Sequence, residues 1–419
     1  GRRISDGSLN RKQFLETIAV DDGTLRSAAG ALGATGDSEG LRFFDSSQPG
    51  KIAFGPSAGL AIGVSIGNQS LRAVLLDANG VSRATYAGNG IAGQLEEPPE
   101  FLLSRIQKAV GAVVAEGLKR QELQVDGGLP LLGVSVAWPG PLTRSKLPVG
   151  NALAHHSWRH GTALDDRVAN HLHIPGDRSH AMNDLPAAAI AVAYDQTMRR
   201  DHLHQSHPRL TVIMRIAAGV GAGMVVVEPP QDDADLGMTS GFGKSVLLGG
   251  VDHHSGEIGH IPANLNLIGD LNAGLAEADR LVPRPCSCAP AADPEFGHLE
   301  SYAGALALAA RIDPGRPPDQ VIAEVVADPE GDLHRKPLED LGTLLGDALV
   351  GPLAMLNPAS IALTGTLALA PVARAMRTVL GKVHHFGTTP AISLLEDPEE
   401  NKFVRARGAA LLVLRRHVF

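Results

Sequence analysis

The segment from Ser255 to Glu300 gathers the residue types with the most chemistry in this sequence. Its carboxylates, imidazoles and thiols are Glu257, His260, Cys286, Cys288, His298 and Glu300. Glu257 lies in the run Gly-Glu-Ile-Gly-His and precedes His260 by three residues, so one helical turn places both side chains on the same face. We expect a binding site here rather than a surface loop.

The same segment contains a candidate metal site. Cys286 and Cys288 are two residues apart, a spacing that strains a mutual disulfide but allows two thiolates to bind one ion. His260 and His298 would complete a tetrahedral zinc set, and four protein ligands leave no open position, so such a zinc would be structural. The alternative is two buried free cysteines and unrelated histidines, of which the chain has 17. Spacing alone leaves both interpretations open.

Composition bounds the class of protein. The chain has 419 residues, of which 44% are hydrophobic, which is enough for two cores and favours more than one domain. The net charge of -8 gives no general attraction to nucleic acid, so any DNA contact has to be local. We expect a cytoplasmic protein, because no apolar run is long enough to span a bilayer and no leader is recognisable.

Two strand-turn-strand patterns indicate the organisation of the fold. Leu60–Ile66 reads as a buried strand that enters a tight turn at Gly67, and a second pair of strands surrounds the Gly-rich run 217–223. The repetition predicts two similarly built lobes that close on a cleft. Apolar residues at helical spacing predict helices over 100–118, 338–356 and 404–419, the last packing back on a lobe.

A further candidate site lies at Asn183-Asp184, immediately before a helical run. An aspartate at the start of a helix is usually an N-cap. The alternative is a carboxylate that accepts a hydrogen bond or a proton from a bound hydroxyl group. Upstream, Gly140 lies in a Pro-Gly-Pro turn that follows a buried strand, and Asn151 and Trp158 lie in a polar loop. Trp158 is either a packing anchor or a platform for a ligand.

Together these motifs resemble the ROK family (repressors, open reading frames and kinases) over about residues 60–419. The resemblance is carried by Asn183-Asp184, by the Gly-Glu-Ile-Gly-His run and by the stretch from Cys-x-Cys to Leu-Glu. It implies an α/β, two-lobed actin-like ATPase fold, shared by sugar kinases, actin and heat-shock chaperones, with an interlobe cleft. It also implies the structural zinc, in which His298 stands at the position of a family cysteine.

The resemblance assigns roles to individual residues. Asp184 is the implied catalytic base. The implied sugar-binding residues are Gly140, Asn151, Asn183, Asp184, Glu257, His260 and Glu300. The implied nucleotide-binding residues, weakened relative to the family pattern, are Gly67, Asn68, Gln69, Gly219, Gly221 and Gly365. The implied metal ligands are His260, Cys286, Cys288 and His298.

Substitutions in the phosphate loops favour a regulator over a kinase. Ser65 replaces the aspartate that supports the magnesium of the nucleotide, Asn68 replaces a glycine, and Ala218 replaces a phosphate-binding threonine. We therefore expect a ROK-type transcriptional regulator that senses a sugar or amino sugar in the cleft. The alternative is an ATP-dependent sugar kinase of the glucokinase or N-acetylhexosamine kinase type, which would use Mg-ATP.

Family regulators carry a winged helix-turn-helix before the sugar-binding body, and residues 1–56 stand in that place. Two short amphipathic helices are expected there, at 9–19 and 24–32, but an acidic, glycine-broken stretch follows where a recognition helix is expected. A degenerate DNA-binding module for operator DNA and a purely structural helical extension both remain open. Beyond this region we expect an N-terminal lobe (57–180), a C-terminal lobe with the zinc segment (181–403) and a final helix (404–419). The resemblance favours a homodimer or homotetramer.

Overall fold

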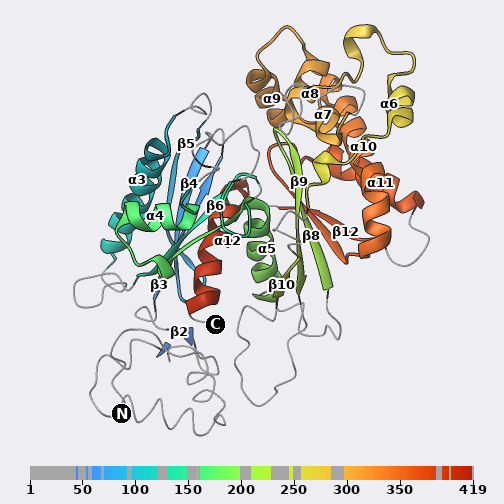
Figure 1. The fold of residues 1–419 in the computed structure, drawn as a ribbon. Helices are drawn as coiled ribbons and strands as arrows, with labels where there is room; N and C mark the ends of the chain where they lie inside the picture. Colours follow the sequence, from blue (N-terminus) through green and yellow to red (C-terminus); the bar gives the residue numbers. More distant parts are fainter. Residues whose placement is uncertain are drawn as a thin grey trace, which may run out of the picture.

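Two β-sheets, with helices between them and outside them, form the two lobes of the molecule (Figure 1). The computed structural model describes residues 44–45, 53–54, 59–67, 70–91, 97–120, 131–140, 142–148, 158, 161–198, 209–227, 245–248, 256–284, 297–383, 389–395 and 398–417. The first two of these pieces, β1 (Phe44–Asp45) and β2 (Ala53–Phe54), pair antiparallel.

The N-terminal lobe is built on a five-stranded mixed sheet. Its strands are β3 (Leu60–Ile66), β4 (Ser70–Asp77), β5 (Ser82–Asn89), β6 (Leu131–Trp138) and β7 (Ser179–Asn183). Their order is β5-β4-β3-β6-β7, with β3, β4 and β5 antiparallel and with β6 and β7 added parallel to β3. The parallel half needs helical crossovers, which are α3 (Pro99–Leu118) and α4 (Leu164–Leu172).

The C-terminal lobe repeats this topology. Its strands are β8 (Arg209–Ile216), β9 (Val220–Val227), β10 (Ser245–Leu247), β11 (Ser360–Thr364) and β12 (Ala391–Leu394). The order β10-β9-β8-β11-β12 again places an antiparallel meander on one side of the first strand and two parallel strands on the other. The prediction of two similarly built lobes is therefore confirmed.

Two helices occupy the space between the sheets, α5 (Asp184–Met198) and α12 (Pro398–His417) (Figure 1). One hydrophobic core combines them with the inward faces of both sheets, including Ala61 of β3 and Ile213 of β8. The run 187–193 of α5 is buried on all sides, which explains its alanine-rich composition, because small side chains allow close approach to both neighbours.

The alternation of side chains along β3 shows how closely α12 approaches. Leu60, Ile62 and the other large residues of the strand belong to the outer core, whereas Ala61 faces α12. Gly63 faces the same way as Ala61, and a Cβ placed on it would lie 1.8 Å from the backbone oxygen of Ala406. A side chain at this position would therefore push the helix away from the sheet.

The outer faces of the sheets are covered by the remaining helices. The α3 and α4 helices cover the first sheet. The second sheet is covered by α10 (Asp332–Leu356) and α11 (Ala370–Val383), with shorter helices around them: α6 (Leu265–Asn272), α7 (Leu299–Ala303), α8 (Ala305–Ile312) and α9 (Pro318–Ala327). None of the helices in the described residues is long and apolar enough to cross a membrane.

Most predicted elements have the predicted type, and three boundaries need correction. The last helix begins at Pro398, not at 404, and it packs between both sheets rather than on one lobe. The α10 helix begins at Asp332, six residues before the predicted start, and continues through Pro337. The second strand of the second pair begins at Val220 instead of Met224. The two helices expected within 1–56 lie outside the described residues.

Candidate functional site

Asn183 and Asp184 lie where β7 ends and α5 begins. Oδ1 of Asn183 accepts a hydrogen bond from the backbone N–H of Leu185 at 2.9 Å, so Asn183 satisfies an N–H group in the first turn of the helix. The Asp184 carboxylate is therefore available for another role although it is only 4% exposed. A sugar-binding role for Asn183 stays a prediction.

The carboxylate of Asp184 is paired with an arginine that the motifs did not identify. Nη1 of Arg405, on α12, donates to Oδ2 of Asp184 at 2.8 Å, and both side chains are largely buried. A Cβ on Gly67 would lie 3.4 Å from Nη2 of the same guanidinium. Arg405 thus occupies the space between the end of β3 and the proposed catalytic base. One feature of the sequence could have indicated this pair: Arg405 is a basic residue within a predicted buried helix, and a buried charge needs a partner.

Glu257 and Glu300 approach Asp184 from the C-terminal lobe. Burial and, to a smaller extent, the negative charges of Asp184 and Glu300 together raise the pKa of Glu257 to about 7. Oε2 of Glu300 would be 2.6 Å from a Cβ on Gly219 and 3.1 Å from one on Gly259, so both glycines make room for this carboxylate. The structure therefore brings together the three predicted acids of the site.

His260 belongs to the same group. It ends the short 3₁₀ turn Ile258–His260, and its Nε2 lies 3.5 Å from Oε2 of Glu257, as the spacing of three residues predicts. The two side chains are 29% and 35% exposed, respectively. A carboxyl group with a pKa near 7 both donates and accepts hydrogen bonds at neutral pH, which suits the hydroxyl groups of a sugar.

The two histidines of the predicted zinc set lie beside each other. The rings of His260 and His298 meet edge to face with centroids 5.3 Å apart, and a short bridge between Pro262 and His298 aligns their segments. Cys286 and Cys288 lie outside the described residues. Among the residues that are described, no group of three or more His, Cys, Asp or Glu side chains is arranged to hold a metal ion. The structure thus brings together two of the four predicted ligands, His260 and His298, and the zinc stays a prediction.

The predicted phosphate loops contribute backbone turns around this acidic group. Gly365 has φ +98°, and a Cβ there would lie 2.5 Å from the Ile216 oxygen, so the turns after β8 and β11 touch. Gly221 lies within β9 against Leu185 of α5. Ser65 is completely buried, and its hydroxyl has no hydrogen-bond partner among the described residues. Asn68 and Gln69 lie outside those residues.

The predicted substrate-side loop is described only in part. Gly140 has φ +127°, a conformation that favours glycine, and its N–H donates to the oxygen of Trp138 at 3.0 Å. Trp158 is buried against Trp138 with ring centroids 5.4 Å apart, and the Arg167 guanidinium lies 5.3 Å from its ring centroid. Trp158 is therefore a packing anchor. Asn151 lies outside the described residues.

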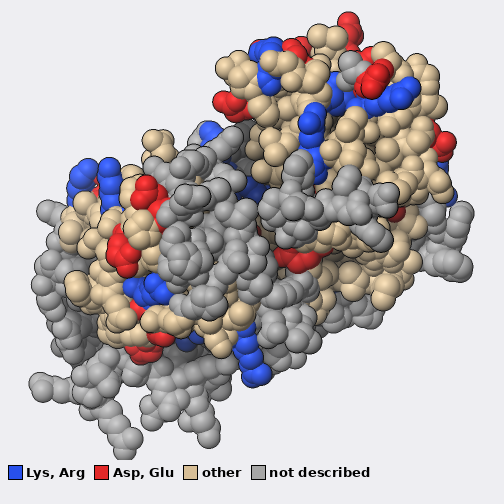
Figure 2. Space-filling model, turned by 45° about the horizontal axis from the view of Figure 1, so that its top comes forward, with Lys and Arg blue, Asp and Glu red and all other residues tan. Residues whose placement is uncertain are grey.

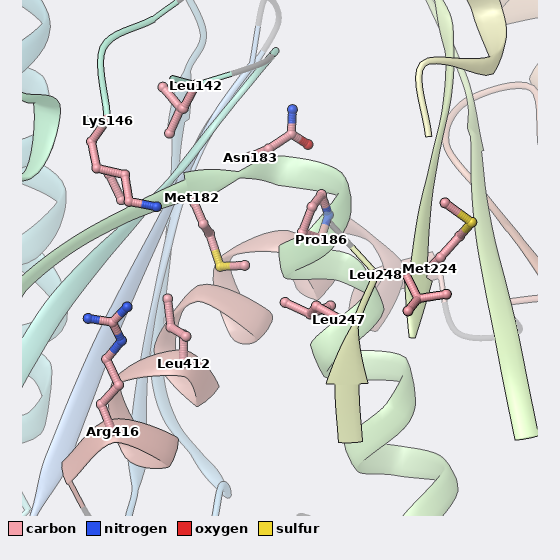
Figure 3. A pocket seen from close by; sticks show the side chains of 11 residues that line it. Leu142, Lys146, Met182, Asn183, Pro186, Met224, Leu247, Leu248, Leu412 and Arg416 are labelled. Carbon is pink, nitrogen blue, oxygen red and sulfur yellow. The ribbon is translucent and has the colours of Figure 1, made fainter. Parts of the chain in front are cut away.

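A cavity of about 160 Å³ lies behind Asn183, between β7, α12 and the end of β10 (Figure 3). Its lining is mostly apolar, with Lys146 and Arg416 on one side of Met182 and with Met224 on the other. Burial lowers the pKa of Lys146, and the charge of Asp165 partly offsets this. No motif in the sequence indicated this cavity, because its lining comes from separate elements.

Comparisons with known proteins define the fold. No protein-family model matches the sequence, and no curated protein matches it. A ROK family glucokinase from Streptomyces griseus, in complex with glucose and AMPPNP, matches with a TM-score of 0.56 and 19% identity over 84% of this chain and 99% of its own. A ROK hexokinase from Thermus thermophilus matches with a TM-score of 0.54 and 17% identity over 85% of this chain and 99% of its own.

A transcriptional regulator is among the similar structures as well. It is a ROK family protein described as a homolog of the E. coli MLC protein, and it matches with a TM-score of 0.57 and 14% identity over 91% of this chain and 90% of its own. At these identities the likeness is one of fold. The chain has the two-lobed α/β fold of ROK kinases and regulators, which is an actin-like ATPase fold, and the fold class predicted from the sequence is confirmed.

Proposed function

We propose that this chain is a ROK-type regulator that binds a sugar or amino sugar in the interlobe cleft without transferring phosphate to it. The main observation in support is the pairing of Asp184 with Arg405 at 2.8 Å. In a kinase, this carboxylate has to be within reach of the attacking hydroxyl group. Here one of its oxygens is already engaged by a guanidinium that also fills the space beside Gly67.

The nucleotide side supports the same proposal. The side chain of Ser65 carries no charge, so it cannot support a magnesium ion as an aspartate would. Ala218 leaves the turn between β8 and β9 without a hydroxyl donor for phosphate. The acids Asp184, Glu257 and Glu300 remain grouped, and they are suitable acceptors for sugar hydroxyls even where nothing is transferred.

The second candidate is a sugar kinase, which the grouping of these three carboxylates also favours. Two of the similar structures are a glucokinase with bound glucose and a hexokinase. Phosphoryl transfer depends mostly on positioning and electrostatics, so a bound sugar that displaced Arg405 from Asp184 would restore the base. Only turnover distinguishes the two candidates.

The test combines calorimetry and an ATP turnover assay on the full chain with a panel of hexoses and N-acetylhexosamines. We expect one sugar to bind without turnover, and Asp184→Asn to weaken its binding by about tenfold or more, because a charged acceptor is lost. Asp195→Asn is the matched control, since Asp195 pairs with Arg407 between the same two helices, α5 and α12. Turnover that disappears in Asp184→Asn would establish the kinase instead.

A regulator also has to recognise DNA, and residues 1–56 are the proposed contact. On the face in Figure 2, basic and acidic side chains of the described residues are interspersed, and the net charge of the chain is -8. We therefore expect operator recognition to depend on the N-terminal region and not on the lobes. The test is to select DNA sequences that bind the full chain from a random pool, and then to measure whether the sugar releases the selected DNA from the protein. Absence of an enriched sequence would leave a sensor that does not bind DNA.

A further inference from the structure

The cavity behind Asn183 is distinct from the group of acids in the cleft. Asp184, Glu257 and Glu300 do not belong to its described lining. Asn183 is the one predicted site residue that lines it, and its Oδ1 is turned to the backbone N–H of Leu185. The cavity therefore needs an explanation of its own.

Position along α12 separates the two places further. Arg405 pairs with Asp184 in the cleft, whereas Leu412 and Arg416 line the cavity. These two residues follow Arg405 by seven and eleven positions, which corresponds to about 10 and 16 Å along a helix that rises about 1.5 Å per residue. An occupant of the cavity thus meets a different part of α12 from a ligand at Asp184.

Most of the lining is apolar, and it comes from both lobes (Figure 3). Met182 of β7 and Pro186 of α5 face Met224 of β9 and Leu247 of β10 across the cavity. The backbone N–H of Leu248 donates to the oxygen of Met224 at 3.0 Å, so this wall continues the second sheet. An apolar cavity of about 150 Å³ binds one benzene ring. The volume here, about 160 Å³, therefore suits one six-membered ring.

Lys146 enters the lining from a tight hairpin. Leu142 and Pro148 form a bridge across this hairpin, and the N–H of Lys146 donates to the oxygen of Thr143 at 2.9 Å. Lys146 has φ +60°, which is uncommon outside glycine, and its oxygen accepts a hydrogen bond from the N–H of Leu164 at 3.1 Å. The backbone is thus fixed on both sides of the Lys146 side chain.

Arg416 enters the lining at the same end. Its Nη1 contacts Nδ1 of His180 at 3.4 Å, and because a guanidinium only donates, Nδ1 is the acceptor nitrogen of a neutral ring. Nε2 of His180 then carries the proton and donates to Nε2 of His417 at 3.2 Å. Burial lowers the pKa of His180 to about 4, in agreement with a neutral ring at pH 7. This contact positions Arg416 without neutralising its charge.

The described lining contains two cations, Lys146 and Arg416, and no carboxylate. Asp165, whose negative charge acts on Lys146, is not part of it. Both cations lie on one side of Met182, and the apolar side chains of the C-terminal lobe lie on the other (Figure 3). The cavity is therefore amphipathic, with a positive end and an apolar end.

We propose that this cavity binds a small apolar carboxylate, whose ring or short chain occupies the apolar end and whose carboxylate group contacts Lys146 and Arg416. This inference goes beyond the proposed function and does not depend on a bound sugar. A guanidinium donates two parallel hydrogen bonds to a carboxylate, and a lysine adds a point charge. Because β7, α5, α12, β9 and β10 all contribute to the lining, the occupant contacts elements of both lobes.

The experiment is calorimetry of the full chain with benzoate and cyclohexanecarboxylate. Benzamide serves as the neutral analogue, and acetate serves as the anion without a ring. We expect at least one ring carboxylate to bind about tenfold or more tightly than both benzamide and acetate. Lys146→Gln should reduce the preference over benzamide about fivefold or more, because a hydrogen bond to a charged group is lost. Leu412→Phe should weaken binding of the ring carboxylate, because the larger side chain fills part of the cavity.

Arg178→Gln is the matched control. Arg178 lies two residues before His180, and its Nη1 donates to the oxygen of Leu131 at 3.3 Å, outside the described lining. This variant also removes one positive charge, and the preference should persist in it. An equal loss in Arg178→Gln and Lys146→Gln would indicate a general effect of net charge and would overturn the proposal.

The wild-type protein provides a test that does not depend on how the variants fold. Absence of binding of both ring carboxylates would overturn the proposal. So would benzamide or acetate that binds as tightly as benzoate, because the cavity would then select neither the charge nor the ring. A preference that is unchanged in Lys146→Gln would exclude Lys146 as a ligand and would contradict the proposal as well.

Discussion

Replacement of Glu257 by glutamine should change how the stability of the protein depends on pH. The pKa of Glu257 is raised from 4.5 to about 7, first by burial and then by the charges of Asp184 and Glu300. A folded-state pKa above the unfolded value means that the folded state binds the proton more tightly. The protonated carboxyl therefore contributes stability that is fully present below pH 4.5 and is lost as the pH rises through about 7. Glutamine resembles the protonated form at every pH.

The size of the effect follows from the same two values. The difference between 4.5 and about 7 corresponds to about 3.4 kcal/mol at 1.36 kcal/mol per pH unit. The Glu257 side chain is 35% exposed, so water and salt screen part of this interaction. We expect Glu257→Gln to be more stable than the wild-type protein by about 1 to 2 kcal/mol at pH 8, with the difference shrinking toward zero at pH 5.

Urea unfolding of both proteins at pH 5, 6, 7 and 8 measures this difference. Burial lowers the pKa of His180 to about 4, so its stability contribution is lost as the pH falls from 6.5 through about 4. That contribution is present in both proteins and cancels. His260 lies 3.5 Å from the Glu257 carboxylate, so both proteins are also compared in a His260→Gln background, which removes this titratable neighbour. A stability difference that stays constant between pH 5 and pH 8 would refute the reasoning.

Two further predictions concern packing and metal. Gly63→Ala should destabilise the protein by about 3 kcal/mol or more, because the new Cβ would lie 1.8 Å from the Ala406 oxygen and backbone atoms cannot rotate away; urea unfolding measures the change. Cys286→Ser should release the proposed zinc and lower the melting temperature by about 2 °C or more, as a loss of about 2 kcal/mol does in a chain of 419 residues; metal analysis and thermal unfolding measure both.

Each of these predictions has its own control. Gly111 lies in α3 with nothing within 4 Å of an added Cβ, so Gly111→Ala should be neutral or slightly stabilising. Similar losses in the two glycine variants would contradict the packing argument. Wild-type protein treated with a chelator should melt at the temperature of Cys286→Ser. Wild-type protein that contains no zinc before such treatment would remove the metal prediction.

The lobes were predictable because their strands follow simple rules. The buried runs at 60–66 and 131–137 end in turns, and the glycine-rich repeat at 217–223 indicates a second strand pair. The acids could be grouped through the family resemblance and the spacing of Glu257 and His260. The partnership of Arg405 could not be predicted, because Arg405 and Asp184 are 221 residues apart and no local pattern relates them.

The position of α12 explains why Arg405 contacts Asp184. The helix is held against β3 by Gly63, and a Cβ on its own Gly408 would lie 1.7 Å from the Ala187 oxygen of α5. Two backbone contacts of this kind leave little freedom for the helix to slide, so Arg405 is fixed against the first turn of α5. The charge pair is thus imposed by the packing of both lobes on one helix. A sugar hydroxyl that reaches the Asp184 carboxylate must therefore displace the hydrogen bond from Arg405 or share the carboxylate with it, and in either case the change is made at the helix that contacts both sheets.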